Sequence, residues 1–227
     1  MVSLWRKKVK TYNIGDQVTY NGMDFYVIAN SDKTKDSVTL LKAEPLTVDE
    51  VNKYGVGHIN KYTSANQGTV GNWQINGYGG MTYYSSENCG YVNGSWVTEG
   101  CTTDYDASEV KYAVDAWAVD KLNVNDLTKD SLGYTARLLT YEELTINLGY
   151  TRDVGATSMS LNTEKTPSWV YNERYYYWTM SQYDNSNSNI WYVYVDGSVN
   201  SYYVYASSGY GGFGTVRSVV TLLKSAL

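Results

Sequence analysis

The residues that decide the fold are Tyr175-Tyr176-Tyr177-Trp178-Thr179-Met180 and, after a polar stretch, Trp191-Tyr192-Val193-Tyr194-Val195. Aromatic and β-branched residues favour strands, and Asp196-Gly197, directly after the second run, favours a tight turn. In the second run the tryptophan and the valines alternate with the tyrosines, so the two kinds of side chain should lie on opposite faces of a strand. The sequence therefore predicts three strands, one from the first run and two on either side of the turn.

The segment 181–214, which contains the second run, has an extreme composition. Of its 34 residues, 25 are Tyr, Ser, Asn, Asp or Gly. The same residues make up antibody binding loops, where tyrosine gives rigid contact area and Ser, Asn and Gly give adaptable hydrogen bonds. We expect a ligand-binding segment, and the alternative is a loop-rich β segment in a protein that uses tyrosine throughout. The candidate ligand-binding residues are Tyr183, Asp184, Asn185, Asn187, Asn189, Tyr192, Tyr194, Asn200, Tyr202, Tyr203, Tyr205 and Tyr210.

Three helix starts share one pattern, a capping residue followed three positions later by glutamate. They are Thr47-Val48-Asp49-Glu50, Asp106-Ala107-Ser108-Glu109 and Thr140-Tyr141-Glu142-Glu143. Gly55 and Gly149 are expected to end the first and third helices in the left-handed conformation. The second helix carries an apolar stripe that should pack on a sheet. The stripe consists of Val110, Ala113, Val114, Trp117, Ala118 and Leu122.

The two ends of the chain are predicted to be β structure. Runs at 17–20 and 23–28 flank Asn21-Gly22, a dipeptide that tolerates the positive φ values of a hairpin turn, and a third run follows at 37–41. A last strand is expected from Thr215 to Leu223. Helix and strand signals do not alternate as in parallel βαβ folds, so the expected fold class is α+β, a small twisted sheet with two or three helices on one side.

Two cysteines, Cys89 and Cys101, lie in a stretch from Gly57 to Thr103 in which no helix or strand period is sustained. So long a loop is uncommon unless it is functional or cross-linked. We expect a disulfide between the two cysteines and an extracellular or cell-surface location; the alternative is two free thiols in a cytosolic protein.

Catalytic groups are scarce. His58 is the only histidine, and neither cysteine has a base beside it in the sequence. The pairs Asp49-Glu50 and Glu142-Glu143 lie in the first turns of expected helices, where negative charge is favourable without catalysis. We therefore expect no enzyme, no cofactor and no metal centre. Asp104 and Asp106 leave only a weak surface calcium site as an alternative.

The charge and hydropathy patterns limit the partners. A net charge of −5 and a pI near 4.9 argue against nucleic acid, which needs a basic surface. No apolar run is long enough to span a membrane, so contact with a membrane is expected only through an N-terminal anchor outside this sequence. Residues 1–10 are expected to form a solvated tail, and residues 11–227 a single domain.

Four short motifs carry a resemblance to a known family. They are Tyr177-Trp178-Thr179-Met180-Ser181, Ile190-Trp191-Tyr192-Val193, Asp196-Gly197-Ser198-Val199 and the ending Gly214 to Leu222. Together with the step Arg137 to Leu144, they resemble a bacterial C-type-lectin-fold family related to formylglycine-generating-enzyme-like domains. Members occur as variable proteins diversified by retroelements and behind pilin-like N-termini in gut bacteria.

The resemblance implies a C-type lectin-like domain that displays a changeable ligand-binding face, here the segment 181–214. It implies a protein or glycan ligand on another cell or on a phage or host surface. Two alternatives are a lectin of fixed specificity for a glycan and a structural subunit of a pilus. Calcium-dependent sugar binding and oxidase activity do not carry over, because their motifs are absent. Arg217 is expected to anchor the final strand, and Ser218 stands where the family usually has proline.

Overall fold

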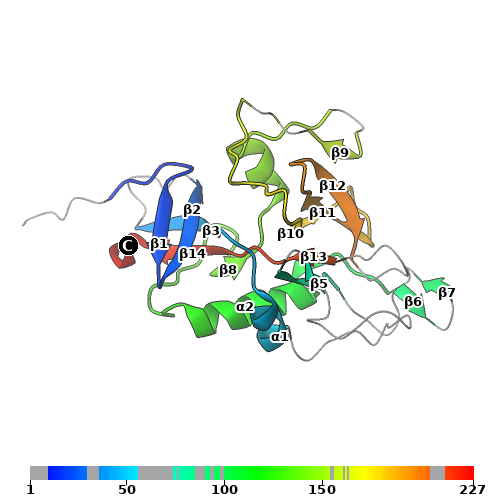
Figure 1. Cartoon of the computed structure of the whole chain (residues 1–227), viewed down its shortest axis with the longest axis horizontal. Coiled ribbons are helices and arrows are strands. Elements are labelled where there is room, and N and C mark those ends of the chain that lie inside the picture. The colour runs from blue at the N-terminus through cyan, green and yellow to red at the C-terminus, as the bar shows by residue number, and fades with distance from the viewer. Residues whose placement is uncertain are drawn as a thin grey trace, which may run out of the picture.

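The computed structural model describes residues 10–29, 36–55, 74–75, 77–84, 90–92, 95–97, 100–153, 156–160, 162, 164–204 and 213–227. These residues form an α+β fold, with two large sheets and helices packed beside them (Figure 1). The predicted fold class is confirmed at this level. The expectation of one small sheet is wrong, because the strands divide between a five-stranded and a seven-stranded sheet.

The five-stranded sheet contains the first and the last strand of the described chain. Its order is β1 (Gln17–Tyr20), β2 (Met23–Ala29), β3 (Ser37–Lys42), β14 (Val219–Leu223) and β8 (Ala136–Arg137), all antiparallel. The predicted meander is confirmed. Asn21 and Gly22 take φ values of 48° and 74°, which give the tight turn that the dipeptide predicts.

The seven-stranded sheet carries the aromatic segments. Its order is β4 (Gln74–Ile75), β5 (Tyr78–Thr82), β13 (Phe213–Thr215), β10 (Tyr177–Gln182), β11 (Asn189–Val193), β12 (Val199–Tyr203) and β9 (Ser158–Met159). β10 and β13 pair in parallel, and the other neighbours are antiparallel. β6 (Gly90–Val92) and β7 (Ser95–Val97) form a separate hairpin. The turn at Asp196-Gly197 is confirmed, with Gly197 at φ 82°.

Two strand predictions are wrong. The expected single strand from Thr215 to Leu223 is divided, because the chain leaves one sheet after β13 and joins the other at β14.

The expected loop from Gly57 to Thr103 contains β5, a strand with neighbours on both sides. A Cβ atom on Gly79 of β5 would lie 2.5 Å from Val51 and 2.9 Å from the carbonyl oxygen of Thr47. Glycine therefore stands in this strand because helix α1 packs against its backbone.

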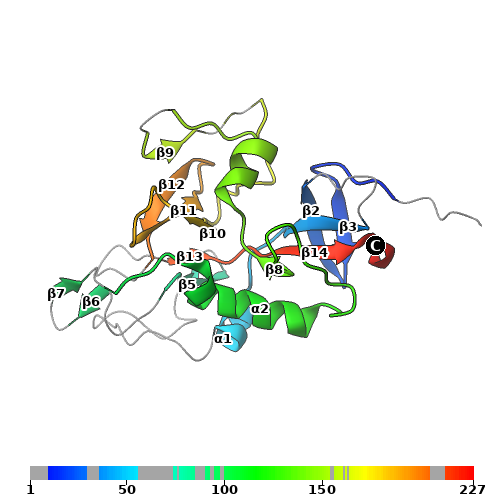
Figure 2. The ribbon, with the colours of Figure 1, turned by 180° about the vertical axis from the view of Figure 1, so that it is seen from behind.

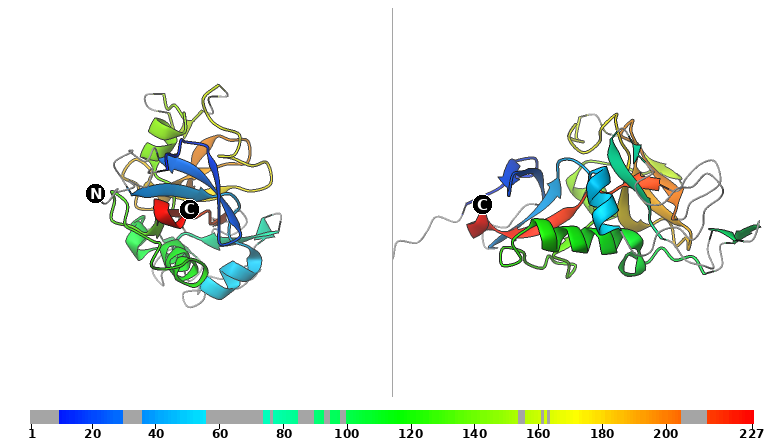
Figure 3. Two further views of the ribbon diagram at one scale, coloured as in Figure 1. Left: turned by 90° about the vertical axis from the view of Figure 1, so that its left-hand side faces the viewer. Right: turned by 60° about the horizontal axis from the view of Figure 1, so that its bottom comes forward.

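Helix α1 (Val48–Tyr54) has both hydrogen bonds of the predicted capping box, between Thr47 and Glu50. Helix α2 (Glu109–Lys121) begins after Ser108 and not after Asp106 as predicted. Asp104 instead caps a 3-10 turn, η1 (Tyr105–Ala107), which comes directly before α2. The predicted apolar stripe of α2 is buried throughout. Both helices lie along the same side of the molecule, below the two sheets in Figure 2 and in the left panel of Figure 3.

The third predicted helix start is confirmed in its hydrogen bonds. Thr140 and Glu143 exchange the two bonds of a capping box, although the helix that follows, η2 (Glu143–Asn147), is π-helical. Gly149 takes the expected positive φ, 80°, whereas Gly55 has φ −77° and the prediction there is wrong. A last 3-10 turn, η3 (Lys224–Ala226), ends the chain.

Arg217 lies in the short connection from β13 to β14, where the chain passes from one sheet to the other. It anchors this connection, whereas the sequence predicted that it anchors the final strand itself. Its guanidinium is buried and donates to the carbonyl oxygens of Lys42 at 2.7 Å, Val170 at 2.8 Å and Trp169 at 2.8 Å. The charged group also lies over the ring of Tyr177, 5.3 Å from its centroid. Arg217 thus joins the end of β3 to the segment that precedes β10.

Candidate ligand-binding face

Four tyrosines form one aromatic surface on the seven-stranded sheet. Tyr176 precedes β10, Tyr192 lies in β11, Tyr194 follows it, and Tyr202 lies in β12. The ring of Tyr192 is 5.9 Å from Tyr176, 5.8 Å from Tyr194 and 5.3 Å from Tyr202, measured between centroids. We call these four residues the tyrosine face.

The strand register explains why these rings meet. Tyr192 pairs with Trp178 on one side and with Asn200 on the other, and directly paired residues share a face of the sheet. Tyr202 is two residues beyond Asn200, and side chains at that spacing lie on the same side of a strand. The alternation in the sequence therefore predicted the direction of the tyrosines correctly.

The tyrosine face is only partly open to solvent. Tyr194 is 38% exposed and Tyr176 and Tyr202 are half-buried, whereas Tyr192 is only 8% exposed. The prediction that Tyr192 is an exposed contact residue is therefore wrong. Its ring is enclosed by the other three tyrosines and by Trp178, whose ring centroid is 6.3 Å away.

Burial makes these phenols, which are already neutral near pH 7, still weaker acids. It raises the pKa of Tyr176 to about 12, with smaller contributions from Tyr202 and Tyr194, and it also raises the pKa of Tyr192 and Tyr202. At physiological pH these three hydroxyl groups therefore donate and accept hydrogen bonds without charge. A neutral, rigid, aromatic surface of this kind suits binding and offers no general base.

The turn between β10 and β11 holds a second group of predicted residues. Asp184 and Asn185 have φ values of 39° and 60°, and the amide of Ser186 donates to the carbonyl oxygen of Tyr183 at 2.7 Å. Aspartate and asparagine are the non-glycine residues that best tolerate two positive φ values in succession. Asp184 accepts two hydrogen bonds from the guanidinium of Arg152, at 2.7 and 2.5 Å.

The predicted site residues thus lie in three places: the two opposite faces of the sheet and the β10–β11 turn. Tyr192, Tyr194, Asn200 and Tyr202 belong to one face of the sheet. Tyr203 pairs with Asn189 and points the other way by register, and Tyr183 packs against Trp191, which also lies on that opposite face. The turn contributes Asp184, Asn185 and the exposed Asn187. Tyr205 and Tyr210 lie outside the described residues.

Sequence reasoning missed two contributors. Tyr176 was assigned to a strand but not to the site, although it is two residues before Trp178, which pairs with Tyr192. Arg152 lies in a polar stretch between η2 and β9, thirty-two residues before Asp184, the turn residue that it contacts. No pattern near Arg152 in the sequence indicates that contact.

The described residues include one of the two cysteines of the predicted disulfide. Cys101 is disulfide-bonded, half-buried and packed against the hydrophobic core. Cys89 lies outside the described residues, as does His58, so the pairing stays a prediction.

A cleft of about 370 Å³ lies at the start of helix α2, and Asp106, Glu109, Lys111 and Asp115 line it. Burial raises the pKa of Glu109 to about 8. Asp106 accepts a hydrogen bond from the Tyr134 hydroxyl at 3.0 Å. Within the described ranges, no three His, Cys, Asp or Glu side chains gather closely enough to hold a metal ion.

Glu109 should make stability fall as the pH rises. Its carboxyl binds a proton more tightly in the folded chain than in the unfolded chain, so the folded state loses stability between about pH 4.3, the ordinary pKa of glutamate, and about pH 8. We expect Glu109→Gln to raise the free energy of unfolding at pH 8 by about 2 kcal/mol, a value discounted for water that reaches the cleft. Urea unfolding at pH 5 and pH 8 measures this. An equal effect of the substitution at both pH values would contradict it.

No helix among the described segments is both long and apolar enough to cross a bilayer. Comparison of the chain with protein-family models, with curated proteins and with solved structures finds no match.

Proposed function

We propose that this chain is a non-catalytic, surface-displayed binding protein with a C-type lectin-like fold, which contacts a protein or glycan ligand through the tyrosine face and the β10–β11 turn. The observation that carries the proposal is the tyrosine face itself. Its rings are held by a three-stranded framework, yet Tyr176, Tyr194 and Tyr202 keep part of their surface in solvent.

The physical support is a contrast in burial between the framework residues of the three strands and the tyrosines that they hold. Trp178, Trp191, Val193 and Val199 are at most 1% exposed, and they come from the same three strands as the tyrosine face. A tyrosine held on such a framework loses little conformational entropy when it binds, because it has few rotatable bonds. Partly desolvated aromatic side chains surrounded by similar neighbours are typical centres of binding energy in interfaces.

The same contrast supports diversification by a retroelement. Mutagenesis at adenines links the codons of Asn, Tyr, Ser, Asp and Gly, whereas the tryptophan codon and suitable valine codons contain no adenine. In the described part of 181–214, the exposed residues Asp184, Asn185, Asn187, Tyr194, Asp196 and Tyr203 belong to the first set, and the exposed Gln182 is the one exception. Trp191, Val193 and Val199 belong to the second set and are buried. The proposal includes a location outside the cytoplasm, in agreement with the disulfide-bonded Cys101.

Binding is tested with Tyr194→Ser, which changes the most exposed ring of the tyrosine face. Wild type and variant are applied to an array of purified glycans and cell-surface proteins. We expect ligands retained by the wild type to bind the variant at least about tenfold more weakly, because an exposed aromatic anchor is lost. The control is Val119→Ser on helix α2, where the side chain is 65% exposed and lies outside the tyrosine face. Equal binding by all three proteins would overturn the assignment of the face.

A further inference from the structure

The strongest further feature of the described structure is a pocket beside the β10–β11 turn, which the proposed function already includes as a contact. It has a volume of about 450 Å³, within the range of small-molecule sites. Residues from three parts of the chain line it: the start of helix η2, the segment before β9, and the β10–β11 hairpin. Trp191 lies on the face of the sheet opposite the tyrosine face, so the pocket is a separate site.

The side chains of the pocket are held in place before any ligand binds. The guanidinium of Arg152 lies 4.9 Å from the ring centroid of Trp191, and its Nε donates to the carbonyl oxygen of Ala156 at 2.8 Å. Its two terminal nitrogens donate to Asp184, and this bonding lowers the pKa of Asp184, so the ion pair is present at neutral pH. The amide of Tyr141 donates to the Ser181 hydroxyl at 2.8 Å and fixes the helix against the hairpin.

The chemistry of the pocket selects one class of ligand. Two carboxylates, Glu142 and Asp184, and one guanidinium line the pocket, in a chain of net charge −5, so phosphate, sulfate and acidic sugars are disfavoured. Gln182 and Asn185 add amides that can both donate and accept hydrogen bonds. A neutral sugar needs donors and acceptors together, and an aromatic wall for its apolar face.

We propose that this pocket binds a neutral sugar residue, as a free saccharide or as the end of a glycan. The inference rests on the proposed function in one respect, that the chain is a binding protein, but it places the sugar away from the tyrosine face. The Arg152–Asp184 pair positions hydrogen-bonding groups for the sugar hydroxyls, and the half-buried ring of Tyr141 supplies the aromatic wall. Trp191 is only 1% exposed and supports the guanidinium of Arg152 from below.

The test uses two variants that preserve the turn. Asp184→Asn and Asn185→Gly both introduce residues that tolerate positive φ, so the hairpin keeps its shape while the pocket loses a charge or an amide. Free neutral monosaccharides and disaccharides are applied at millimolar concentration, with glucuronic acid and a sulfated sugar for comparison. Saturation-transfer NMR and calorimetry measure binding, and Val119→Ser is the matched surface control.

We expect a neutral sugar to bind the wild type and the control equally, and to bind either turn variant at least about tenfold more weakly. Binding lost in Tyr194→Ser but kept in Asp184→Asn would overturn the pocket and support the tyrosine face. Binding of the acidic sugars alone, or of no sugar, would overturn the inference. Loss of array ligands in Tyr194→Ser would still support the proposed function in that case.

Discussion

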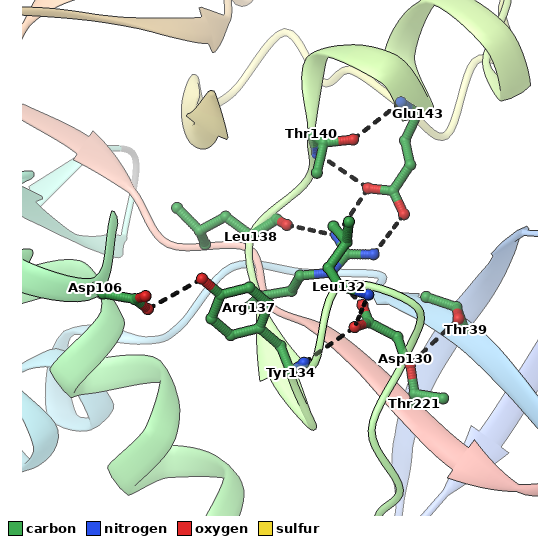
Figure 4. A network of polar contacts seen from close by, with 10 residues as sticks. All are labelled: Thr39, Asp106, Asp130, Leu132, Tyr134, Arg137, Leu138, Thr140, Glu143 and Thr221. Carbon is green, nitrogen blue, oxygen red and sulfur yellow. Dashed lines mark hydrogen bonds and ion pairs between the residues drawn. The ribbon is translucent and has the colours of Figure 1, made fainter. Parts of the chain in front are cut away.

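Replacement of Arg137 by methionine is expected to lower the free energy of unfolding by about 3–5 kcal/mol. The side chain is 4% exposed and donates from Nε to Asp130 at 2.5 Å and from its terminal nitrogens to Glu143 at 2.8 and 2.6 Å (Figure 4). Without the guanidinium, Glu143 becomes a buried carboxylate that has lost its charged partner. Glu143 also closes the capping box with Thr140, so the start of helix η2 should loosen with it.

Urea unfolding of two further proteins separates this effect from simple loss of packing. Arg137→Met combined with Glu143→Gln should recover part of the loss, because the second substitution removes the buried charge. Lys53→Met breaks the exposed ion pair with Asp120 and should lower the free energy of unfolding far less than Arg137→Met, because solvent screens the pair. Similar losses for Arg137→Met and Lys53→Met would contradict the account of the buried pair.

Tyr192→Ala is expected to lower the free energy of unfolding by about 3 kcal/mol, whereas Tyr194→Ala should lower it by less than about 1 kcal/mol. Both residues come from the same strand run and were predicted alike from the sequence. Tyr192 is enclosed by four aromatic rings, and its removal leaves a cavity in the sheet, whereas Tyr194 is 38% exposed. Thermal and urea unfolding measure the two losses. Equal losses would mean that Tyr192 does not support the tyrosine face.

Local signals in the sequence predicted much of the fold. The boxes at Thr47 and Thr140 and the turn at Asn21-Gly22 depend on contacts within four residues, and all three formed as predicted. β5 could not be predicted in this way, because the reason for Gly79 is the packing of α1 against it, which is a tertiary contact. The division of the last strand also depends on the two sheets that it joins.

The sequence predicted on which face of the sheet the tyrosines lie, but not how deeply each ring is buried. Alternation along 191–195 placed the tyrosines opposite Trp191, and the register agrees. Whether a given ring is exposed depends on neighbours from other strands, and Tyr192 is covered by residues of three strand segments. Arg152 reaches Asp184 across thirty-two positions of sequence, so only the folded chain brings them together.

The central claim is that a constant framework displays a changeable binding face, and sequencing the locus in several isolates tests it most directly. The account predicts a near-copy of the DNA encoding 181–214 close to a reverse transcriptase gene, differing almost only at adenines. Between isolates, codons for exposed positions such as Asn185 and Tyr194 should differ, and those for the buried Trp191 and Val193 should not. Absence of any such copy, together with identical codons at the exposed positions, would contradict the claim.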